Sequence, residues 1–300
     1  MPPIPSWPSR LVLALLALQL ASACDPTPPP PPPPADTTPP STRATPQGGT
    51  FKANVSVTLL CEDGTGSGCD ATYYTTDGST PSASSPRYSA PVVLAQNTTL
   101  KFFSTDKAGN AESAQSFTFV VDTAAPTTTA TPAGGLYNAP QSVVLACEDG
   151  TGSGCAATHY TTDGSEPTTG SPRYTAAIAI SASTTLKFFS VDTAGNAEAV
   201  HTEEYTFDAE APTTTATPAG GLYNATQSVT LACTDGTGSG CSATYYTTDG
   251  SEPTTGSPRY TAAIALSAST TLKFFSVDAA GNAEAVHTEV YTLDTVAPAT

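Results

Sequence analysis

The chain of 300 residues has very little positive charge, a single methionine and a single tryptophan. Its ten Lys and Arg residues stand against 26 Asp and Glu residues, so the formal net charge is −16. Phosphate groups are bound by clusters of Lys and Arg, and no such cluster occurs in the sequence. The composition therefore argues against nucleic acid and anionic lipid headgroups as partners.

Helical periodicity is missing throughout, and the long apolar run Leu11–Leu20 is confined to the start of the chain. This run follows Arg10 and is followed by the small residues Ala21, Ser22 and Ala23. A positive charge, a short apolar run and small residues are typical of a secretory signal peptide, which is too short to span a bilayer stably. We predict a signal peptide at residues 1–23 and an exported mature chain.

Cys24 follows the predicted signal peptide directly. The segment Ala21–Cys24 resembles the bacterial lipobox, whose cysteine is acylated and becomes the mature N-terminus. The cysteine count agrees, because six of the seven cysteines fall in pairs further along the chain and Cys24 remains over. The resemblance implies lipid attachment at Cys24, a membrane partner through that lipid, and a place at the surface or in the periplasm of a bacterium. Ordinary cleavage after Ala23, which would leave a free thiol, is the alternative.

Residues 24–40 form a proline-rich linker, with seven consecutive prolines at Pro28–Pro34. Each proline ring fixes φ and removes a backbone donor, so the segment cannot join a sheet or continue a helix. A polyproline II rod and a disordered linker both remain open. Either would separate the lipid from the folded part of the chain.

One segment is repeated three times at a spacing of 86 residues: Cys61–Cys69 returns as Cys147–Cys155 and Cys233–Cys241. A long fixed period indicates an array of similar domains. We predict domains at residues 41–125, 126–211 and 212–297, with residues 298–300 as the start of a truncated further unit.

Each repeat is predicted to be an all-β domain. Alternating residues put Leu186 and Phe188 on one face of a strand. In the second repeat, strands are expected at Thr127–Thr131, Gln141–Cys147, Ala157–Thr162, Arg173–Ile180, Thr184–Val191 and Ala199–Phe207. About seven short strands per unit predict three tandem immunoglobulin-like antiparallel β-sandwiches.

The cysteines of each repeat end one predicted strand and precede the next, across a Gly-rich loop. Pairing within a repeat is therefore the economical arrangement, and exported small domains often need such bonds. We predict disulfides Cys61–Cys69, Cys147–Cys155 and Cys233–Cys241. Metal-bound or free cysteines are the alternative, but no histidine lies near these pairs in the sequence to complete a zinc site.

An ordered series of motifs occurs in every repeat: Tyr-Thr-Thr-Asp-Gly-Ser, Ser-Pro-Arg-Tyr, Thr-Thr-Leu-Lys-Phe-Phe-Ser and Asp-x-Ala-Gly-Asn. The series resembles the chitobiase/β-hexosaminidase C-terminal domain family over Tyr73–Asn110, Tyr160–Asn196 and Tyr245–Asn282. The resemblance implies small immunoglobulin-like or fibronectin-like modules that adjoin a catalytic barrel and hold no catalytic residue. No segment here could supply such a barrel, which takes about 250 residues.

Several acidic residues could serve either a turn or a site. Asp77, Asp163 and Asp249 each precede a glycine and are predicted to be turn residues, with a calcium or catalytic role as the alternative. Glu148-Asp149, and Asp192 with Asn196, could offer oxygens to calcium. Thr234 replaces Glu148 in the third repeat, so structural turns are favoured here too, and we predict no metal site, no cofactor and no catalytic residue.

Histidines and tyrosines also occupy positions that could be structural or functional. His159 takes the place of Tyr73 and Tyr245 and is expected on a strand surface, while His201 and His287 have no cysteine or serine nucleophile assigned to them. Adjacent tyrosines point to opposite faces of a strand, so one of each pair is expected in the core and the other could stack on a sugar ring. One Arg and one Lys recur at the same positions in all three copies, and they are expected to form local ion pairs. These residues are Arg87, Arg173, Arg259, Lys101, Lys187 and Lys273.

The sequence thus predicts a non-catalytic bacterial cell-surface lipoprotein, built as a tandem stalk for adhesion or display. The alternative is an accessory region, with carbohydrate binding as one role, of a glycan-active enzyme whose catalytic domain lies beyond Thr300. A cell-envelope glycan or protein partner stays open in either case, and none is identified from the sequence.

Overall fold

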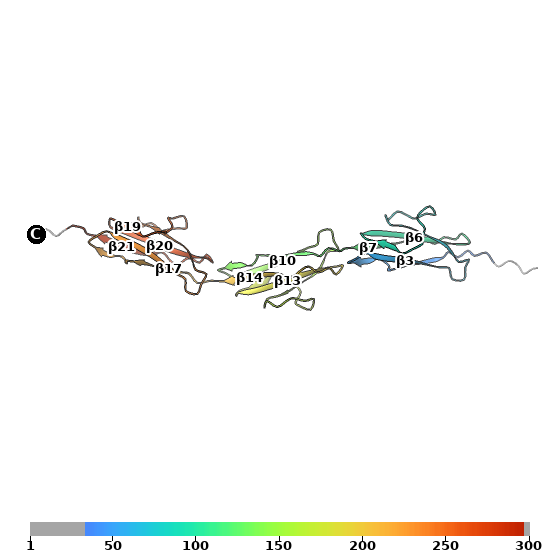
Figure 1. Cartoon of the computed structure of the whole chain (residues 1–300), viewed down its shortest axis with the longest axis horizontal. Coiled ribbons are helices and arrows are strands. Elements are labelled where there is room, and N and C mark those ends of the chain that lie inside the picture. Colours follow the sequence, from blue (N-terminus) through green and yellow to red (C-terminus); the bar gives the residue numbers. More distant parts are fainter. Residues whose placement is uncertain (1–33, 297–300) are drawn as a thin grey trace, which may run out of the picture.

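The computed structural model describes residues 34–296 and shows three β-domains arranged end to end (Figure 1). The predicted signal peptide, Cys24 and most of the proline-rich linker lie outside the described residues. The exact domain boundaries given above stay predictions. No helix long and apolar enough to cross a membrane occurs among the described residues.

Every domain contains seven strands in the same order. The first domain has β1 (Ser41–Thr45), β2 (Gly49–Phe51), β3 (Val55–Glu62), β4 (Cys69–Thr75), β5 (Val92–Leu94), β6 (Thr98–Asp106) and β7 (Gln115–Val121). The second has β8 (Thr127–Thr131), β9 (Gly135–Tyr137), β10 (Gln141–Glu148), β11 (Cys155–Thr161), β12 (Ile178–Ile180), β13 (Thr184–Asp192) and β14 (His201–Phe207). The third has β15 (Thr213–Thr217), β16 (Gly221–Tyr223), β17 (Gln227–Thr234), β18 (Cys241–Thr247), β19 (Ile264–Leu266), β20 (Thr270–Asp278) and β21 (His287–Leu293).

The strands of each domain form a sandwich of two sheets. In the second domain, a three-stranded sheet of order β12-β10-β8 faces a four-stranded sheet of order β11-β13-β14-β9. The first and third domains repeat this arrangement. The prediction of three tandem immunoglobulin-like all-β domains is therefore confirmed.

The structure differs from the sequence prediction in two strands. The predicted strand Arg173–Ile180 forms a ladder only at β12, with a single bridge joining Arg173 to His159. The short strand β9 was missed, because its three residues lie among glycines that indicate a turn. β9 pairs in parallel with β14, so the sandwich is not wholly antiparallel.

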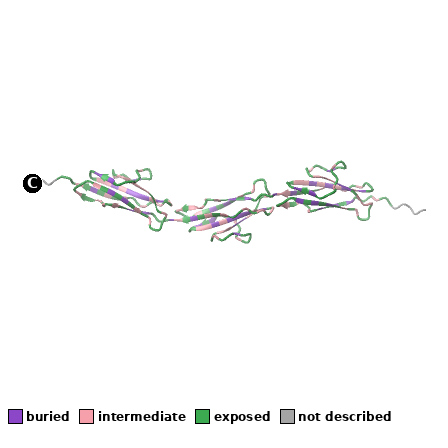
Figure 2. Ribbon diagram, viewed as in Figure 1, coloured by how far each residue is buried: buried purple, intermediate pink, exposed green. Residues whose placement is uncertain are grey.

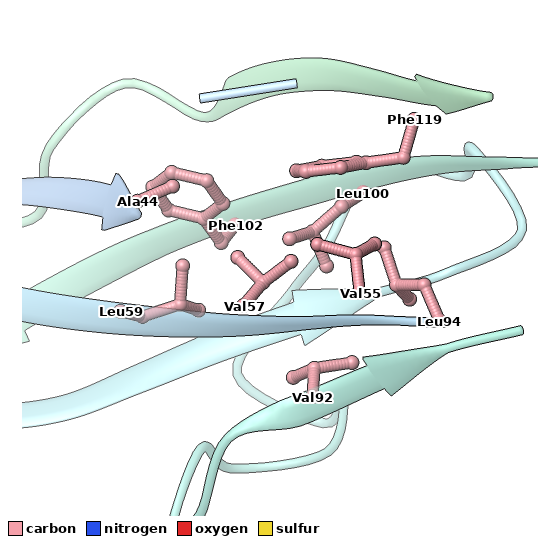
Figure 3. Close-up of a cluster of buried hydrophobic side chains, with 9 residues drawn as sticks. All are labelled: Ala44, Val55, Val57, Leu59, Val92, Leu94, Leu100, Phe102 and Phe119. Atoms are coloured by element: carbon pink, nitrogen blue, oxygen red, sulfur yellow. The ribbon is translucent and has the colours of Figure 1, made fainter. Parts of the chain in front are cut away.

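The core of each domain lies between its two sheets (Figure 2). Strict alternation buries Val55, Val57 and Leu59 of β3 against Leu100 and Phe102 of β6. Figure 3 shows this cluster in the first domain, closed by Ala44, Val92, Leu94 and Phe119. Burial of apolar side chains contributes about 25 cal/mol per Å², so these rows supply the main stabilisation of such small domains.

The inner face of the long central strand changes from apolar to polar along its length. On β13, Leu186 and Phe188 are followed on the same face by Ser190 and Asp192, and all four are buried. The central strand therefore carries an aspartate at the end of its core-facing row. That end lies beside the disulfide and the entering linker.

We predict that Phe188→Ala destabilises the second domain by about 3–5 kcal/mol, because it leaves a cavity at a fully buried position. Calorimetry should show one domain's share of the unfolding enthalpy moving to lower temperature. Val144→Ala, at an exposed position of β10, is the matched control and should leave the transition in place. An equal shift in both variants would contradict this account of the core.

Candidate functional site

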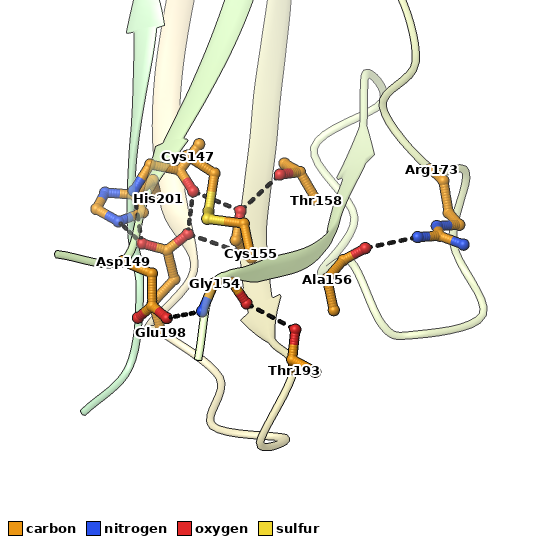
Figure 4. The surroundings of a disulfide bond; sticks show 12 residues. Cys147, Asp149, Gly154, Cys155, Ala156, Thr158, Arg173, Thr193, Glu198 and His201 are labelled. Carbon is orange, nitrogen blue, oxygen red and sulfur yellow. Dashed lines mark hydrogen bonds and ion pairs between the residues drawn. A yellow bond between two sulfur atoms is a disulfide. The ribbon is translucent and has the colours of Figure 1, made fainter. Parts of the chain in front are cut away.

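The disulfides join the two strands that flank each Gly-rich loop. Cys61 pairs with Cys69, Cys147 with Cys155 and Cys233 with Cys241, which are the predicted pairs. Figure 4 shows the loop of the second domain, where the Gly154 amide donates a hydrogen bond of 2.6 Å to Oδ2 of Asp149. The Gly152 amide also donates to the Asp149 carbonyl at 2.8 Å. The side chain and the carbonyl of Asp149 are thus both hydrogen-bonded to amides of its own loop.

A second aspartate, Asp122, lies in the linker between the first two domains and contacts both. Its amide donates to the Phe51 carbonyl of the first domain at 2.9 Å. Its Oδ2 accepts a hydrogen bond from the Ser153 amide at 2.7 Å, and its carbonyl accepts from Nδ2 of Asn196 at 2.9 Å. Hydrogen bonds from Ser153 hold the pKa of Asp122 below its usual value.

A third aspartate, Asp192, comes from the inner row of β13 and is 2% exposed. Its Oδ1 accepts from the Asn196 amide at 2.8 Å, and its Oδ2 accepts from Nδ2 of Asn196 at 2.7 Å. The favoured interpretation of Asp192 and Asn196 as a turn is therefore correct as far as it goes. The turn also places the Asp192 carboxylate next to the linker.

These three aspartates form a compact group, and the group occurs once per domain. In each, one carboxylate oxygen from every aspartate lies within 4.8 Å of the other two. We call these groups the junction clusters; they are Asp36, Asp63 and Asp106; Asp122, Asp149 and Asp192; and Asp208, Asp235 and Asp278. Each consists of a linker residue, a disulfide-loop residue and a strand-end residue.

The second junction is built like the first. The Asp208 amide donates to the Tyr137 carbonyl at 3.1 Å, while its Oδ2 accepts from the Ser239 amide at 2.6 Å. Asp36 makes the corresponding contact to the Ser67 amide at 2.7 Å. A surface hollow adjoins each cluster, and that of the second domain is lined by Asp122, Asp149 and neighbouring loop residues.

Only two members of one cluster, both in the second repeat, could be named from the sequence. These are Asp149 and Asp192, which are possible calcium ligands from their sequence context, whereas Asp122 stands there only as part of a linker. The missing signal is the recurrence of Asp36, Asp122 and Asp208 at the 86-residue period. Glu148, whose replacement by Thr234 argued for a turn, is not a member of the cluster.

A buried polar network lies beneath each disulfide. In the second domain Ser190 Oγ is 2.5 Å from Thr128 Oγ1 and 2.6 Å from Thr158 Oγ1. Oε1 of Glu198 accepts from the Ser190 amide at 2.6 Å, and Oε2 lies 3.1 Å from Nε2 of His201. The carboxylate therefore stands between hydroxyl and imidazole, whereas a catalytic triad needs the imidazole next to the hydroxyl. Ser190 is also fully buried, so this network stabilises the domain from within.

The aromatic side chains named in the sequence analysis pack against the core or against a neighbouring strand of their own sheet. Tyr74 packs against the core, as expected for one residue of the pair, and Tyr73 stacks on Phe103 at 5.4 Å between ring centroids. The guanidinium of Arg87 lies 5.8 Å from the Tyr73 ring centre. The expectation of a surface position for His159 is wrong, because this ring is 6% exposed and stacks on Phe189.

The remaining charged residues make local contacts. Oδ1 of Asp77, Asp163 and Asp249 accepts hydrogen bonds from the serine two residues later, which confirms the turn interpretation. Lys187 pairs with Glu166 at 2.6 Å, Lys273 with Glu252, and Arg87 with Asp70 at 3.6 Å. Arg173 and Arg259 instead donate to the carbonyls of Ala156 and Ser242.

The chain is similar to one known family of small domains. The family model for the chitobiase/β-hexosaminidase C-terminal domain matches residues 46–116, 132–202 and 218–288. The chain belongs to this family. The match falls once on each sandwich, which confirms the resemblance drawn from the motifs. A search of curated proteins gives no match.

Solved structures with a similar arrangement are tandem modules of low sequence identity. The fibronectin(III)-like modules of Clostridium thermocellum CbhA are 12% identical, with 56% of this chain and 95% of that chain covered and a TM-score of 0.32. Domains EC1–4 of Drosophila N-cadherin are 11% identical, with 87% and 76% covered and a TM-score of 0.25. Similarity at this level carries no statement about function.

We predict that the pKa of Asp163 lies below its usual value, because Ser165 donates to it through its hydroxyl and its amide. A lowered folded-state pKa stabilises the fold above the unfolded pKa of about 3.9, and this contribution is lost as the pH falls through the folded pKa. The ¹³C resonance of the carboxyl group reports this titration directly. Ser165→Ala should raise the pKa of Asp163 and leave that of Asp249 in place; equal pKa values in both proteins would contradict the assignment.

Proposed function

We propose that this chain is a non-catalytic, exported stalk that a lipid on Cys24 anchors to the bacterial cell envelope. The disulfides and the family indicate an exported protein, since such bonds persist in oxidising compartments. The three sandwiches supply length and stiffness. Adhesion or display at the far end is the role that we assign to the array.

The observation that carries this proposal is the two-sided contact of the linker aspartates. Asp122 binds the first domain through its amide and the second through its carboxylate and carbonyl. Asp208 does the same between the second and third domains. A linker that is hydrogen-bonded to both neighbours restricts rotation between them, which suits a spacer better than a flexible tether.

The absence of a triad geometry supports the non-catalytic part of the proposal. Among the described residues, the Ser190, Glu198 and His201 network has the wrong order of groups, and its serine is closed to solvent. Perturbed pKa values, which often indicate active sites, are found among the described residues in turn and linker aspartates that accept hydrogen bonds from a serine hydroxyl and amide, and in the core tyrosines Tyr205 and Tyr291, where burial raises the pKa to about 12.

We predict that the full precursor, expressed in a bacterium, incorporates radiolabelled palmitate and that Cys24→Ala abolishes the label. Acylation requires the Cys24 thiol, and the other six cysteines are paired. The double variant Cys147→Ser/Cys155→Ser is the control and should retain the label. Equal labelling of the wild type and Cys24→Ala would reject the anchor.

An accessory role beside a glycan-active enzyme is the second candidate, and family membership favours it. The first domain argues against a sugar platform at Tyr73, because this ring stacks on Phe103 and the guanidinium of Arg87 lies over it, 5.8 Å from the ring centre. Tyr245 stacks on Phe275, so a sugar there would have to use the other face of the ring.

We predict that the mature chain is not retained on chitin or peptidoglycan beads above the level seen with cellulose beads. Retention that soluble chitooligosaccharide displaces, and that Tyr245→Ala weakens, would favour the accessory role over the stalk. Tyr246→Phe serves as the matched control, because Tyr246 packs against the core of the same domain.

A further inference from the structure

We propose that each junction cluster binds one calcium ion, so that the chain holds three ions along its length. The proposal concerns residues of the chain itself and does not depend on the lipid anchor or on the stalk function. It rests on four observations: the charge of the cluster, an enclosed oxygen without a donor, a glycine directly against the carboxylates, and the kind of ligand atoms present.

The charge of each cluster is concentrated and uncompensated. Asp122 and Asp192 are 6% and 2% exposed, and their carboxylates meet that of Asp149 within 4.8 Å. Among the described residues, no Lys, Arg or His forms an ion pair with any of the nine cluster aspartates. Like charges this close raise the energy of one another strongly, and a divalent cation removes that repulsion.

An enclosed carboxylate oxygen in the cluster has no hydrogen-bond donor. Oδ1 of Asp149 is buried and unpartnered, and so is Oδ1 of Asp63 in the first domain. The other oxygen of Asp149 accepts from the Gly154 amide at 2.6 Å, so the side chain is held in place while Oδ1 is left without a partner. Leaving a buried charged oxygen unpaired is costly, and a bound cation would satisfy it.

A glycine lies directly against the carboxylates of each cluster, at their Oδ2 atoms in the second domain. A Cβ on Gly152 would lie 2.5 Å from Oδ2 of Asp149 and 2.8 Å from Oδ2 of Asp122. Gly66 and Gly238 occupy the same place in the other clusters, with distances of 2.6 Å to the loop aspartate. The backbone at Gly152 is not in the left-handed region, so glycine is required here by space and not by φ.

The ligand atoms point to calcium among the common metal ions. All are carboxylate oxygens, whereas zinc sites generally use cysteine and histidine. Calcium accepts six to eight oxygens in flexible geometry, while magnesium demands a near-ideal octahedron. Three aspartates from separate segments supply one oxygen each, and the adjoining hollow admits water for the remaining positions.

Occupation of the cluster would tie three separate segments to one ion: the linker, the disulfide loop and the end of the central strand. Asp122 and Asp208 belong to the chain leaving the preceding domain, so the ion would fix that chain to the next sandwich, and at Asp36 it would fix the end of the proline-rich linker to the first sandwich. Without the ion, repulsion among the three carboxylates would loosen the same attachment.

The test is a calorimetric titration of the mature chain, stripped with EGTA, with CaCl₂ at pH 7.4. We expect three calcium ions per chain for the wild type, two for Asp149→Asn, and none for the triple variant Asp63→Asn/Asp149→Asn/Asp235→Asn. Asparagine keeps one oxygen as an acceptor for the Gly154 amide, but it removes the negative charge and replaces Oδ1 with an NH2 group, which cannot bind a cation. Asp163→Asn, in an exposed turn of the same domain, is the matched control and should still bind three.

A second readout does not depend on the variants. Calcium should shift the amide resonances of Ser153, Gly154 and Asn196 in the wild type and leave that of Ser165 unchanged. MgCl₂ should bind at least about tenfold more weakly, because of its stricter geometry. Absence of both heat and shifts at 5 mM CaCl₂, an unchanged stoichiometry in Asp149→Asn, or magnesium binding as tight as that of calcium would overturn the proposal.

Discussion

The arrangement of the whole array depends on one aspartate at each domain boundary that is bound from both sides. Asp122 donates a hydrogen bond to the first domain through its backbone amide and accepts one from the second domain through its carboxylate. The contact requires both a linker of fixed length and a loop whose amides point outward. The linker aspartates Asp36, Asp122 and Asp208 recur at the 86-residue period, so each stands at the same place relative to the loop amide that it accepts from.

The fold could be predicted well because local patterns determine it. Alternation on the central strand, paired cysteines and turn motifs each act over a few residues, and all recur three times. The short strand β9 was missed because its pairing with β14 is parallel and joins residues about 70 positions apart. Nothing local in Gly135–Tyr137 indicates such a partner.

The junction clusters were only half predicted, for the same physical reason. Asp149 and Asp192 stand next to obvious turns, but Asp122 is brought to them by the packing of one domain against the linker of another. On β13, Phe188, Ser190 and Asp192 alternate on one face, so the pattern that places Phe188 in the core also places Asp192 at the inner end of the strand. Glu148, which is Thr234 in the third repeat, lies outside the cluster, whereas the nine clustered aspartates are the same in all three copies.

The short parallel ladder has a mechanical consequence. Each domain is entered near one end and left at the other (Figure 1). β9 follows the entering strand β8 and β14 is the leaving strand, and β9 and β14 lie side by side and run in the same direction. Tension along the chain would therefore slide the two strands past each other. Their hydrogen bonds would carry the load together, and none could open before the rest. An array with this geometry would resist pulling forces, such as flow across a cell surface, with a strength that its small cores alone would not suggest.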